Sequence, residues 1–303
     1  SGRRIRPDRP SLRIACQSPL SVATIPTPLT DDRPVYHIAP SRGWVPVSLG
    51  ELWEFRELFG MLVWRQISVR YKQTVLGVAW ALIQPVMTMV VFSVFFGRLA
   101  GIPTDGVPYP VFAFCALLPW QLFALSMAEA SNSVVANQHM LTKVYFPPRL
   151  LTLSAFALVL VDFALSFAVL AGLMLWYGMV PGWPLLSLPL WTLLAVMTCV
   201  AVSLWFAALN VRYRDVRYTL PFLTQLWLFA TPVAYPTSIV PQAWRTLYAL
   251  NPMVGVVDGF RWALVGGPWP GVTVFVSAAA VAMLLVGGLF YFRRTERTFA
   301  DVV

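Results

Sequence analysis

Six stretches of the chain are predominantly apolar and long enough to cross a lipid bilayer as helices. A helix rises about 1.5 Å per residue, so roughly 20 apolar residues cover the ~30 Å hydrocarbon core of a membrane. Segments that carry charges, prolines or glycines separate these stretches. The pattern therefore predicts an all-α polytopic membrane protein with six transmembrane helices, at residues 75–97, 109–135, 150–177, 185–209, 219–235 and 271–292.

The segment between the fifth and sixth stretches is apolar but broken. Prolines recur at Pro236 and Pro241, and the short apolar run that follows carries Asp258 and Arg261. Short helical pieces of this kind occur at membrane depth where protein or a cavity surrounds them. The sequence therefore predicts a re-entrant helical pair at residues 236–268, on one side of the membrane.

The N-terminal part of the chain has a different pattern. Residues 1–45 are rich in Arg, Pro and Ser, a composition typical of a disordered tail because it buries too little apolar surface to offset the ordering entropy. Within residues 46–73, apolar residues such as Leu52, Phe55 and Leu62 recur at helical spacing, and charged residues fall largely on other faces. This predicts an amphipathic helix at the membrane interface, too charged to span the bilayer.

Composition excludes a soluble protein, and the positions of the charges predict the orientation. Charged residues make up 12% of the chain and hydrophobic residues 58%, whereas about 25% of a typical globular protein is charged. Among the 22 Lys and Arg residues, only Arg98, Arg245 and Arg261 fall on one side of the predicted bilayer. Because basic residues accumulate on the cytoplasmic side, both termini are expected in the cytoplasm. The net charge of +9 then reflects topology rather than nucleic-acid binding.

Residues suited to catalysis or metal binding are scattered. Cys16, Cys115 and Cys199 include no C-x-x-C pair, and His37 and His139 lie far apart in the sequence. No paired carboxylates or nucleophile with a neighbouring base stand out, so we expect neither catalytic residues nor a metal or cofactor in this chain. The phosphate-binding pattern G-x-x-x-x-G-K-[ST] is also missing, so uphill transport would need energy from another subunit or an ion gradient.

Two acidic residues, Glu129 and Asp162, lie inside predicted spans. Ionisable residues at membrane depth are costly, and they mark either pairing between helices or a permeation path. Asp162 falls near the middle of the third span, and both alternatives stay open for it. Ion-coupled carriers usually place several ionisable groups at membrane depth, so two separated acids disfavour an ion-coupled carrier.

Polar and aromatic residues form stripes on the first and fifth spans. Such a stripe avoids lipid, so it indicates either a seam between helices or copies, or part of a wet conduit. Aromatic residues also gather in the interfacial belt of any membrane protein, although their faces can stack on sugar rings. The candidates for lining a channel are Trp80, Gln84, Thr88, Thr224, Trp227, Thr231 and Tyr235.

The loop at residues 137–149 mixes apolar and aromatic residues with few charges, whereas an idle cytosolic loop would be polar. A short helix that docks into a partner protein accounts for this, and packing on the chain's own interfacial helix is the alternative. The candidates for coupling to a partner are Gln138, Met140, Leu141, Lys143, Tyr145, Phe146 and Arg149.

Three separated motifs carry a resemblance to a known family. They are Val69-Arg-Tyr-Lys-Gln-Thr-Val-Leu-Gly-Val-Ala-Trp, then Asn210-Val-Arg-Tyr-Arg-Asp-Val, then Leu250-Asn-Pro-Met with Gly259-Phe-Arg-Trp-Ala-Leu. In this order they resemble the permease subunits of type-2 ABC exporters, and within these the group that exports lipid-linked polysaccharides such as O-antigen, capsule and teichoic acid. The resemblance covers residues 40–303.

The resemblance implies a homodimeric permease with two cytoplasmic ATPase subunits, which bind ATP and Mg. Residues 74–303 would form the permease domain, with residues 137–149 as the coupling helix received by the ATPase. The first and fifth spans would line a channel between protomers, and residues 236–268 would be a periplasmic re-entrant pair.

The expected function is ATP-driven export of a lipid-linked polysaccharide across the bacterial inner membrane, from cytoplasm to periplasm. Basic residues at the cytoplasmic border could attract anionic lipid and a pyrophosphate headgroup. The candidates are Arg70, Lys72, Arg212, Arg214 and Arg217. One alternative is an ABC permease for a drug or small lipid. Another is a polytopic glycan-modifying enzyme, which would need a clustered set of acids or histidines.

Overall fold

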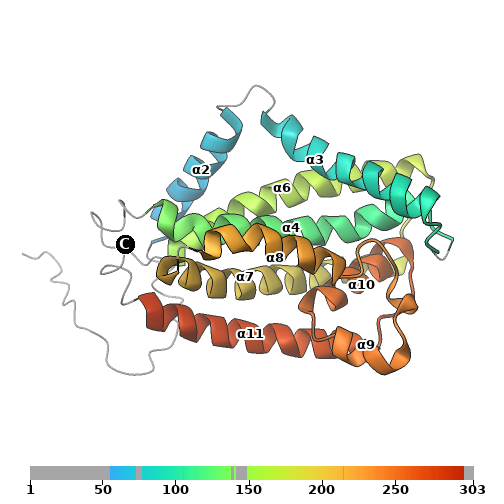
Figure 1. Cartoon of the computed structure of the whole chain (residues 1–303). Helices are drawn as coiled ribbons and strands as arrows, with labels where there is room; N and C mark the ends of the chain where they lie inside the picture. Colours follow the sequence, from blue (N-terminus) through green and yellow to red (C-terminus); the bar gives the residue numbers. More distant parts are fainter. Residues whose placement is uncertain are drawn as a thin grey trace, which may run out of the picture. The chain divides into compact units, whose positions relative to one another are not determined.

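The computed structural model describes residues 55–72, 77–104, 106–137, 140, 149–213 and 215–296, all of which belong to one compact unit (Figure 1). All regular structure within these ranges is helical, as predicted. The predicted disordered tail at residues 1–45 lies outside them. The elements are α2 (Arg56–Lys72), α3 (Gly77–Phe92), η1 (Ser93–Leu99), α4 (Tyr109–Ala136), α6 (Arg149–Trp176), η2 (Trp183–Ser187), α7 (Leu188–Arg212), α8 (Val216–Phe229), η3 (Thr237–Ile239), α9 (Gln242–Tyr248), α10 (Pro252–Val265) and α11 (Val272–Glu296).

Among the described residues, five helical segments are long and apolar enough to cross a membrane, which makes this an integral membrane protein. They correspond to the first four predicted spans and the sixth. In the first, α3 continues without a break into the π-helical segment η1. The five segments are Ala79–Leu99, Tyr109–Ala136, Leu150–Trp176, Trp183–Arg212 and Val272–Thr295.

The fifth predicted span corresponds to α8, which is shorter than expected. This helix has 14 residues and is about 21 Å long, less than the ~30 Å hydrocarbon core. It stops at Phe229, close to Pro232 and Pro236, whose rings and missing N–H groups disfavour continuation of the helix. A sixth crossing by helix alone is therefore not confirmed.

Helix α4 forms the centre of the bundle. It runs beside α6 and α7 (Figure 1), and 78% of its most apolar window is buried within the protein. The corresponding share is 17% for the segment of α3 and η1, and 22% for α11. Apolar side chains on α4 thus meet protein on most sides, whereas α3 is held by few contacts and presents most of its surface outward.

The predicted re-entrant region contains the two short helices α9 and α10, neither long enough to span. They lie at the end of the bundle opposite to the one where α11 terminates (Figure 1). Helix α10 is buried along most of its length and packs on α4, α7 and α11. It ends at Gly266, whose φ of 68° is a left-handed conformation favourable to glycine at a helix C-terminus. A pair of helices is present, and its position relative to the membrane stays a prediction.

Helix α2 covers most of the predicted interfacial helix, residues 46–73, and packs along the first half of α6. Leu62 is buried against Leu150 and Leu151. Met61 and Trp64 are exposed, so apolar and polar residues do not separate onto two clean faces of α2. The helix itself is confirmed over Arg56–Lys72, but its amphipathic character is not.

Candidate functional site

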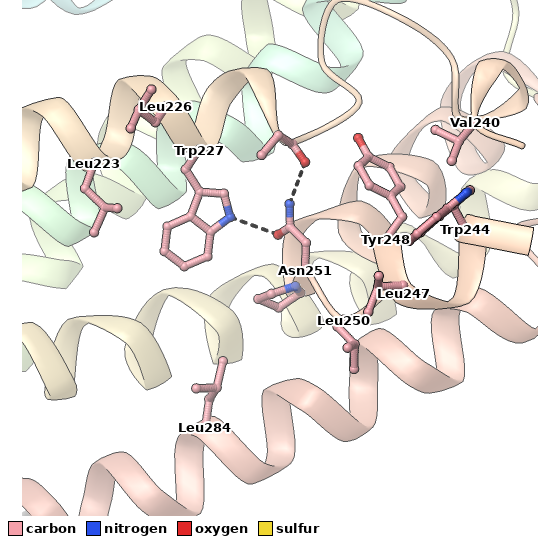
Figure 2. Close-up of a pocket in the computed structure, with 12 residues that line it drawn as sticks. Leu223, Leu226, Trp227, Val240, Trp244, Leu247, Tyr248, Leu250, Asn251 and Leu284 are labelled. Atoms are coloured by element: carbon pink, nitrogen blue, oxygen red, sulfur yellow. Dashed lines mark hydrogen bonds between the residues drawn. The ribbon is translucent and has the colours of Figure 1, made fainter.

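Asn251, the residue before α10, forms hydrogen bonds with the end of α8, the helix that carries several of the predicted channel residues. Its Oδ1 accepts hydrogen bonds from Trp227 Nε1 at 3.0 Å and from the Met253 backbone N–H at 3.1 Å. Its Nδ2 donates to the Ala230 carbonyl at 2.9 Å and to Thr231 Oγ1 at 3.1 Å. Figure 2 shows Asn251 between Trp227 of α8 and the start of α10. One side chain therefore caps α10 and fastens the end of α8 to it.

An open, mostly apolar groove of about 710 Å³ lies beside this asparagine, between α8, α9 and α11. Leu226, Leu247 and Leu284 line it from the three helices, and Trp244 and Tyr248 are at its α9 side (Figure 2). A groove with so few polar groups suits hydrocarbon better than a hydrated glycan.

The polar side-chain atoms of the four predicted channel residues on or near α8 all form hydrogen bonds within the chain. The Thr224 hydroxyl donates to the Leu220 carbonyl, and the fully buried Thr231 donates to the Trp227 carbonyl. The Tyr235 hydroxyl donates to the Phe229 carbonyl and lies 3.0 Å from the Tyr248 hydroxyl. These groups hold the end of α8 in shape, and the channel-lining role stays a prediction.

On α3, the predicted polar stripe divides between two environments. The Trp80 side chain is 60% exposed. Gln84, which is also exposed, and Thr88 line a partly open cavity of about 180 Å³ between α3, α4 and α6, together with Gln121 and Ser166. Water occupies about 30 Å³ per molecule in the liquid, so this cavity, although most of its lining residues are apolar, has room for several waters beside its polar groups.

Arg70, predicted as a headgroup contact, forms two ion pairs beside this cavity. Its guanidinium lies 2.9 Å from Asp162 Oδ2 of α6 and 3.3 Å from Glu129 Oε1 of α4. The hydroxyl of Tyr71 donates a hydrogen bond to Asp162 Oδ1. Burial, and then this hydrogen bond, raise the pKa of Tyr71, so the phenol stays protonated. Pairing between helices was one of the two alternatives for Asp162, and it is the arrangement observed.

The other predicted headgroup residues lie on exposed surface where they are described. The Lys72 ammonium is 5.6 Å from the centroid of the Trp64 ring. Arg212 and Arg217, at the turn between α7 and α8, are both exposed, and the Arg212 guanidinium is 5.4 Å from the Tyr213 ring centroid. Arg214 lies outside the described residues.

The predicted coupling loop is described only in part. Met140 packs against the cluster around Leu62 on α2, and Arg65 Nη1 lies 3.9 Å from its sulfur atom. Arg149 is the first residue of α6. The remaining candidates lie outside the described residues: Gln138, Leu141, Lys143, Tyr145 and Phe146.

A second buried polar network, between the end of α8 and α10, is built on Arg261. This guanidinium donates to the carbonyls of Val233 at 2.9 Å and Tyr235 at 3.2 Å, and lies 3.8 Å from the Phe112 ring centroid. Burial lowers the pKa of Arg261 to about 10, so it stays charged at neutral pH. The Thr237 hydroxyl donates to the Asp258 carboxylate and lies 2.7 and 2.8 Å from its two oxygens, and burial raises the pKa of Asp258.

Asn251 and Arg261 stand inside the motifs that carry the family resemblance, but the sequence alone assigns no structural contact to them or to Asp258. Asn-Pro before an apolar run is a recognisable helix start, because Asn caps and Pro suits the first turn. That signal could have identified the cap at Asn251. The bonds to Trp227 and Ala230 depend on tertiary packing and leave no local pattern.

Replacing Asn251 with alanine is expected to destabilise the protein by about 2 kcal/mol, within the range for lost caps and unsatisfied buried groups. The substitution leaves the Trp227 indole N–H, the Met253 N–H and the Ala230 carbonyl without their partner. The measurement is the midpoint of heat-induced loss of monodisperse protein in detergent. Asn251→Ser should keep the helix cap and lose about half as much stability as Asn251→Ala. Equal losses of stability in the two variants would contradict the link between Asn251 and α8.

Comparison with known proteins gives one consistent result. The ABC-2 type transporter family matches residues 57–265. The O-antigen export system permease protein RfbA of Myxococcus xanthus is 31% identical over 259 residues, which cover 84% of this chain and 98% of that protein. A protein of the same name from Klebsiella pneumoniae is 26% identical over 251 residues, covering 81% and 96%. The polysialic acid transport protein KpsM of Escherichia coli is 25% identical over 238 residues, covering 77% and 91%.

Proposed function

The chain belongs to the ABC-2 type transporter family, and from this premise we propose that it is the membrane-spanning subunit of an ATP-driven polysaccharide exporter. The observation that carries the proposal is the length of the similarity. The match to the O-antigen permease of Myxococcus xanthus covers 98% of that protein, so it includes the membrane helices and the segments between them. The match to a polysialic acid transport protein points to the same class of cargo.

The energy for export would come from partner subunits. The sequence carries no phosphate-binding loop, so two cytoplasmic ATPase subunits would bind ATP and Mg and act on a permease homodimer. The loop at residues 137–149 is the proposed docking element. It directly connects α4 and α6, and α4 is the most buried helix of the bundle. A displacement of this loop would therefore be passed to the centre of the permease.

The cargo would be a lipid-linked polysaccharide that leaves the cytoplasm through a channel at the dimer interface, lined by α3 and α8. Two features of the fold support this assignment. Helix α3 presents most of its surface outward, and the predominantly apolar groove beside α8 has the chemistry of a lipid tail. Exposed Arg212 and Arg217 would attract the anionic headgroup. The protein would lie in the bacterial inner membrane with both termini in the cytoplasm.

The test is removal of this chain from its source cell. We expect surface polysaccharide to be lost and lipid-linked polysaccharide to accumulate inside, with both reversed by the intact gene. Resistance to drugs should stay unchanged, since glycan rather than drug is the proposed cargo. Purification from native membranes should recover an ATPase with the chain. Normal surface polysaccharide after deletion, or lost drug resistance instead, would refute the proposal.

A further inference from the structure

The C-terminal end of α2 is attached to the bundle by charge. Arg70 meets Asp162 of α6 at 2.9 Å, and Tyr71 donates a hydrogen bond to the same carboxylate. The Asp162 side chain is 6% exposed, whereas that of Glu129, the second partner of Arg70, is 46% exposed. Exposed ion pairs contribute little, so Asp162 is the partner that matters.

Contacts between α2 and α6 continue along both helices up to this ion pair. Leu62 packs on Leu150 and Leu151, and the Gln66 amide donates to Ser154 Oγ at 3.1 Å. One to two turns further along both helices lie Arg70 and Asp162. Asp162 is near the middle of α6, about 20 Å from its start. A carboxylate at this depth is expensive without a cation, and removal of one partner of a buried pair is strongly destabilising.

The same pair also lies beside α3. Helix α2 ends at Lys72 and α3 starts at Gly77, so Arg70 and Tyr71 are the polar anchors nearest to the start of α3. The segment of α3 and η1 is only 17% buried, and the cavity of about 180 Å³ separates part of it from α4 and α6. Helix α3 also packs directly on α4 and α6, and Arg70 and Asp162 line this cavity together with Gln84 and Thr88 of α3. The ion pair therefore lies between α6 and α3, where a change in its geometry would act on α3.

Asp162 also lies on a helix that continues directly from the coupling loop. The loop at residues 137–149 ends where α6 begins, and Asp162 is on α6. The chain thus continues from the loop into α6 and Asp162, and the ion pair with Arg70 lies at the cavity that α3 lines. None of these steps needs α3 to contact the loop.

We propose that Arg70 and Asp162 are positioning residues for transport, which transmit movement of α6 to α3. The inference rests on the proposed function, because it takes the loop as the input and α3 as a wall of the conduit. Neither residue needs to touch the cargo for this role. The quantity that the pair controls is the amount of glycan moved for each ATP hydrolysed.

The main variant is Asp162→Asn, which keeps the side-chain size, the acceptor for Tyr71 and the whole of Arg70. Inverted vesicles from the source cell would carry the intact complex and its own lipid-linked glycan, labelled from a radioactive sugar nucleotide. We expect glycan transported per ATP to fall about tenfold, which corresponds to about 1.4 kcal/mol of lost coupling. ATP hydrolysis should stay within about twofold of wild type, because the catalytic subunits are untouched.

Two further variants separate the alternatives. Glu129→Gln neutralises the exposed partner and should change the ratio less than about twofold. Arg70→Met with Asp162→Leu removes both charges, which avoids an unpaired buried charge but leaves the C-terminal end of α2 without its ion pair to α6. The complex with this double variant should assemble, and the glycan that it transports per ATP should stay low. Normal transport per ATP in the double variant would overturn the proposal, even if Asp162→Asn alone failed to assemble.

The outcomes also distinguish this inference from the proposed function. Wild-type vesicles that hydrolyse ATP without moving glycan would refute the function itself. Wild-type vesicles that move glycan, with Asp162→Asn at the same ratio of glycan to ATP, would refute only the positioning role. If Arg70→Met alone lowers transport and Asp162→Asn does not, Arg70 acts on the headgroup and the proposed pair is wrong.

Discussion

Replacing Arg261 with methionine is expected to destabilise the protein by about 3–5 kcal/mol, the cost of breaking a buried charged network by removal of one partner. The Arg261 side chain is 6% exposed overall, and its guanidinium serves the carbonyls of Val233 and Tyr235. Methionine keeps the apolar stem but leaves both carbonyls unsatisfied. It also removes the contact with the Phe112 ring and one of the two positive charges that act on Asp258, which keeps only that of Arg245. The measurement is the yield of monodisperse protein and its thermal midpoint.

The matched control is Arg98→Met, because Arg98 is an exposed arginine at the end of η1. Its loss should change the thermal midpoint little. Adding Asp258→Asn to Arg261→Met should recover part of the loss, since the carboxylate that lost this positive charge is then gone. An Arg261→Met protein as stable as Arg98→Met would show that the network does not support the α8–α10 connection.

The positions of the membrane helices could be predicted because their cause is local. Apolar length alone decides whether a segment can cross a bilayer, and five of the six predicted spans have matching helices. The fifth is not confirmed, because α8 stops at Phe229, just before the prolines that follow. Hydropathy alone favours a longer stretch, because the residues from Ala230 to Tyr235 are mostly apolar apart from Thr231 and Pro232.

The contacts of the candidate site could not be predicted from the sequence in the same way. Tyr71 and Asp162 are separated by 91 positions, and no periodicity indicates that α2 and α6 would bring them together. The sequence alone shows that Asp162 is an ionisable residue at membrane depth, which is energetically costly. It does not show that Arg70 is its partner, because that depends on how α2 packs on α6. Likewise, the hydroxyl of Thr231 suggested a wet surface, whereas the residue is fully buried and bonded to α8 and Asn251.

Replacing Gly259 with valine is expected to destabilise the protein by about 3 kcal/mol, at the upper end of the cost of overpacking a core. A Cβ at this position of α10 would lie 2.1 Å from Cε3 of Trp191, far inside van der Waals contact. The indole cannot easily move away. Its Nε1 donates to Ser187 Oγ at 2.9 Å, and its ring packs edge to face against Trp262 and Trp269. The thermal midpoint and the fraction of aggregated protein report the effect.

The matched control is Gly172→Ala, because a Cβ on that helical glycine of α6 meets nothing within 4 Å. It should raise stability by about 0.5–1 kcal/mol, since alanine is the better helix former. The clash itself is tested by Trp191→Leu, which removes the ring that the new side chain would strike. Gly259→Val and Trp191→Leu together should cost less than the sum of the two single changes, as expected for residues in contact. Additive losses would mean that Gly259 is needed for some reason other than the close approach of Trp191, and the packing of α10 against α7 would then need another explanation.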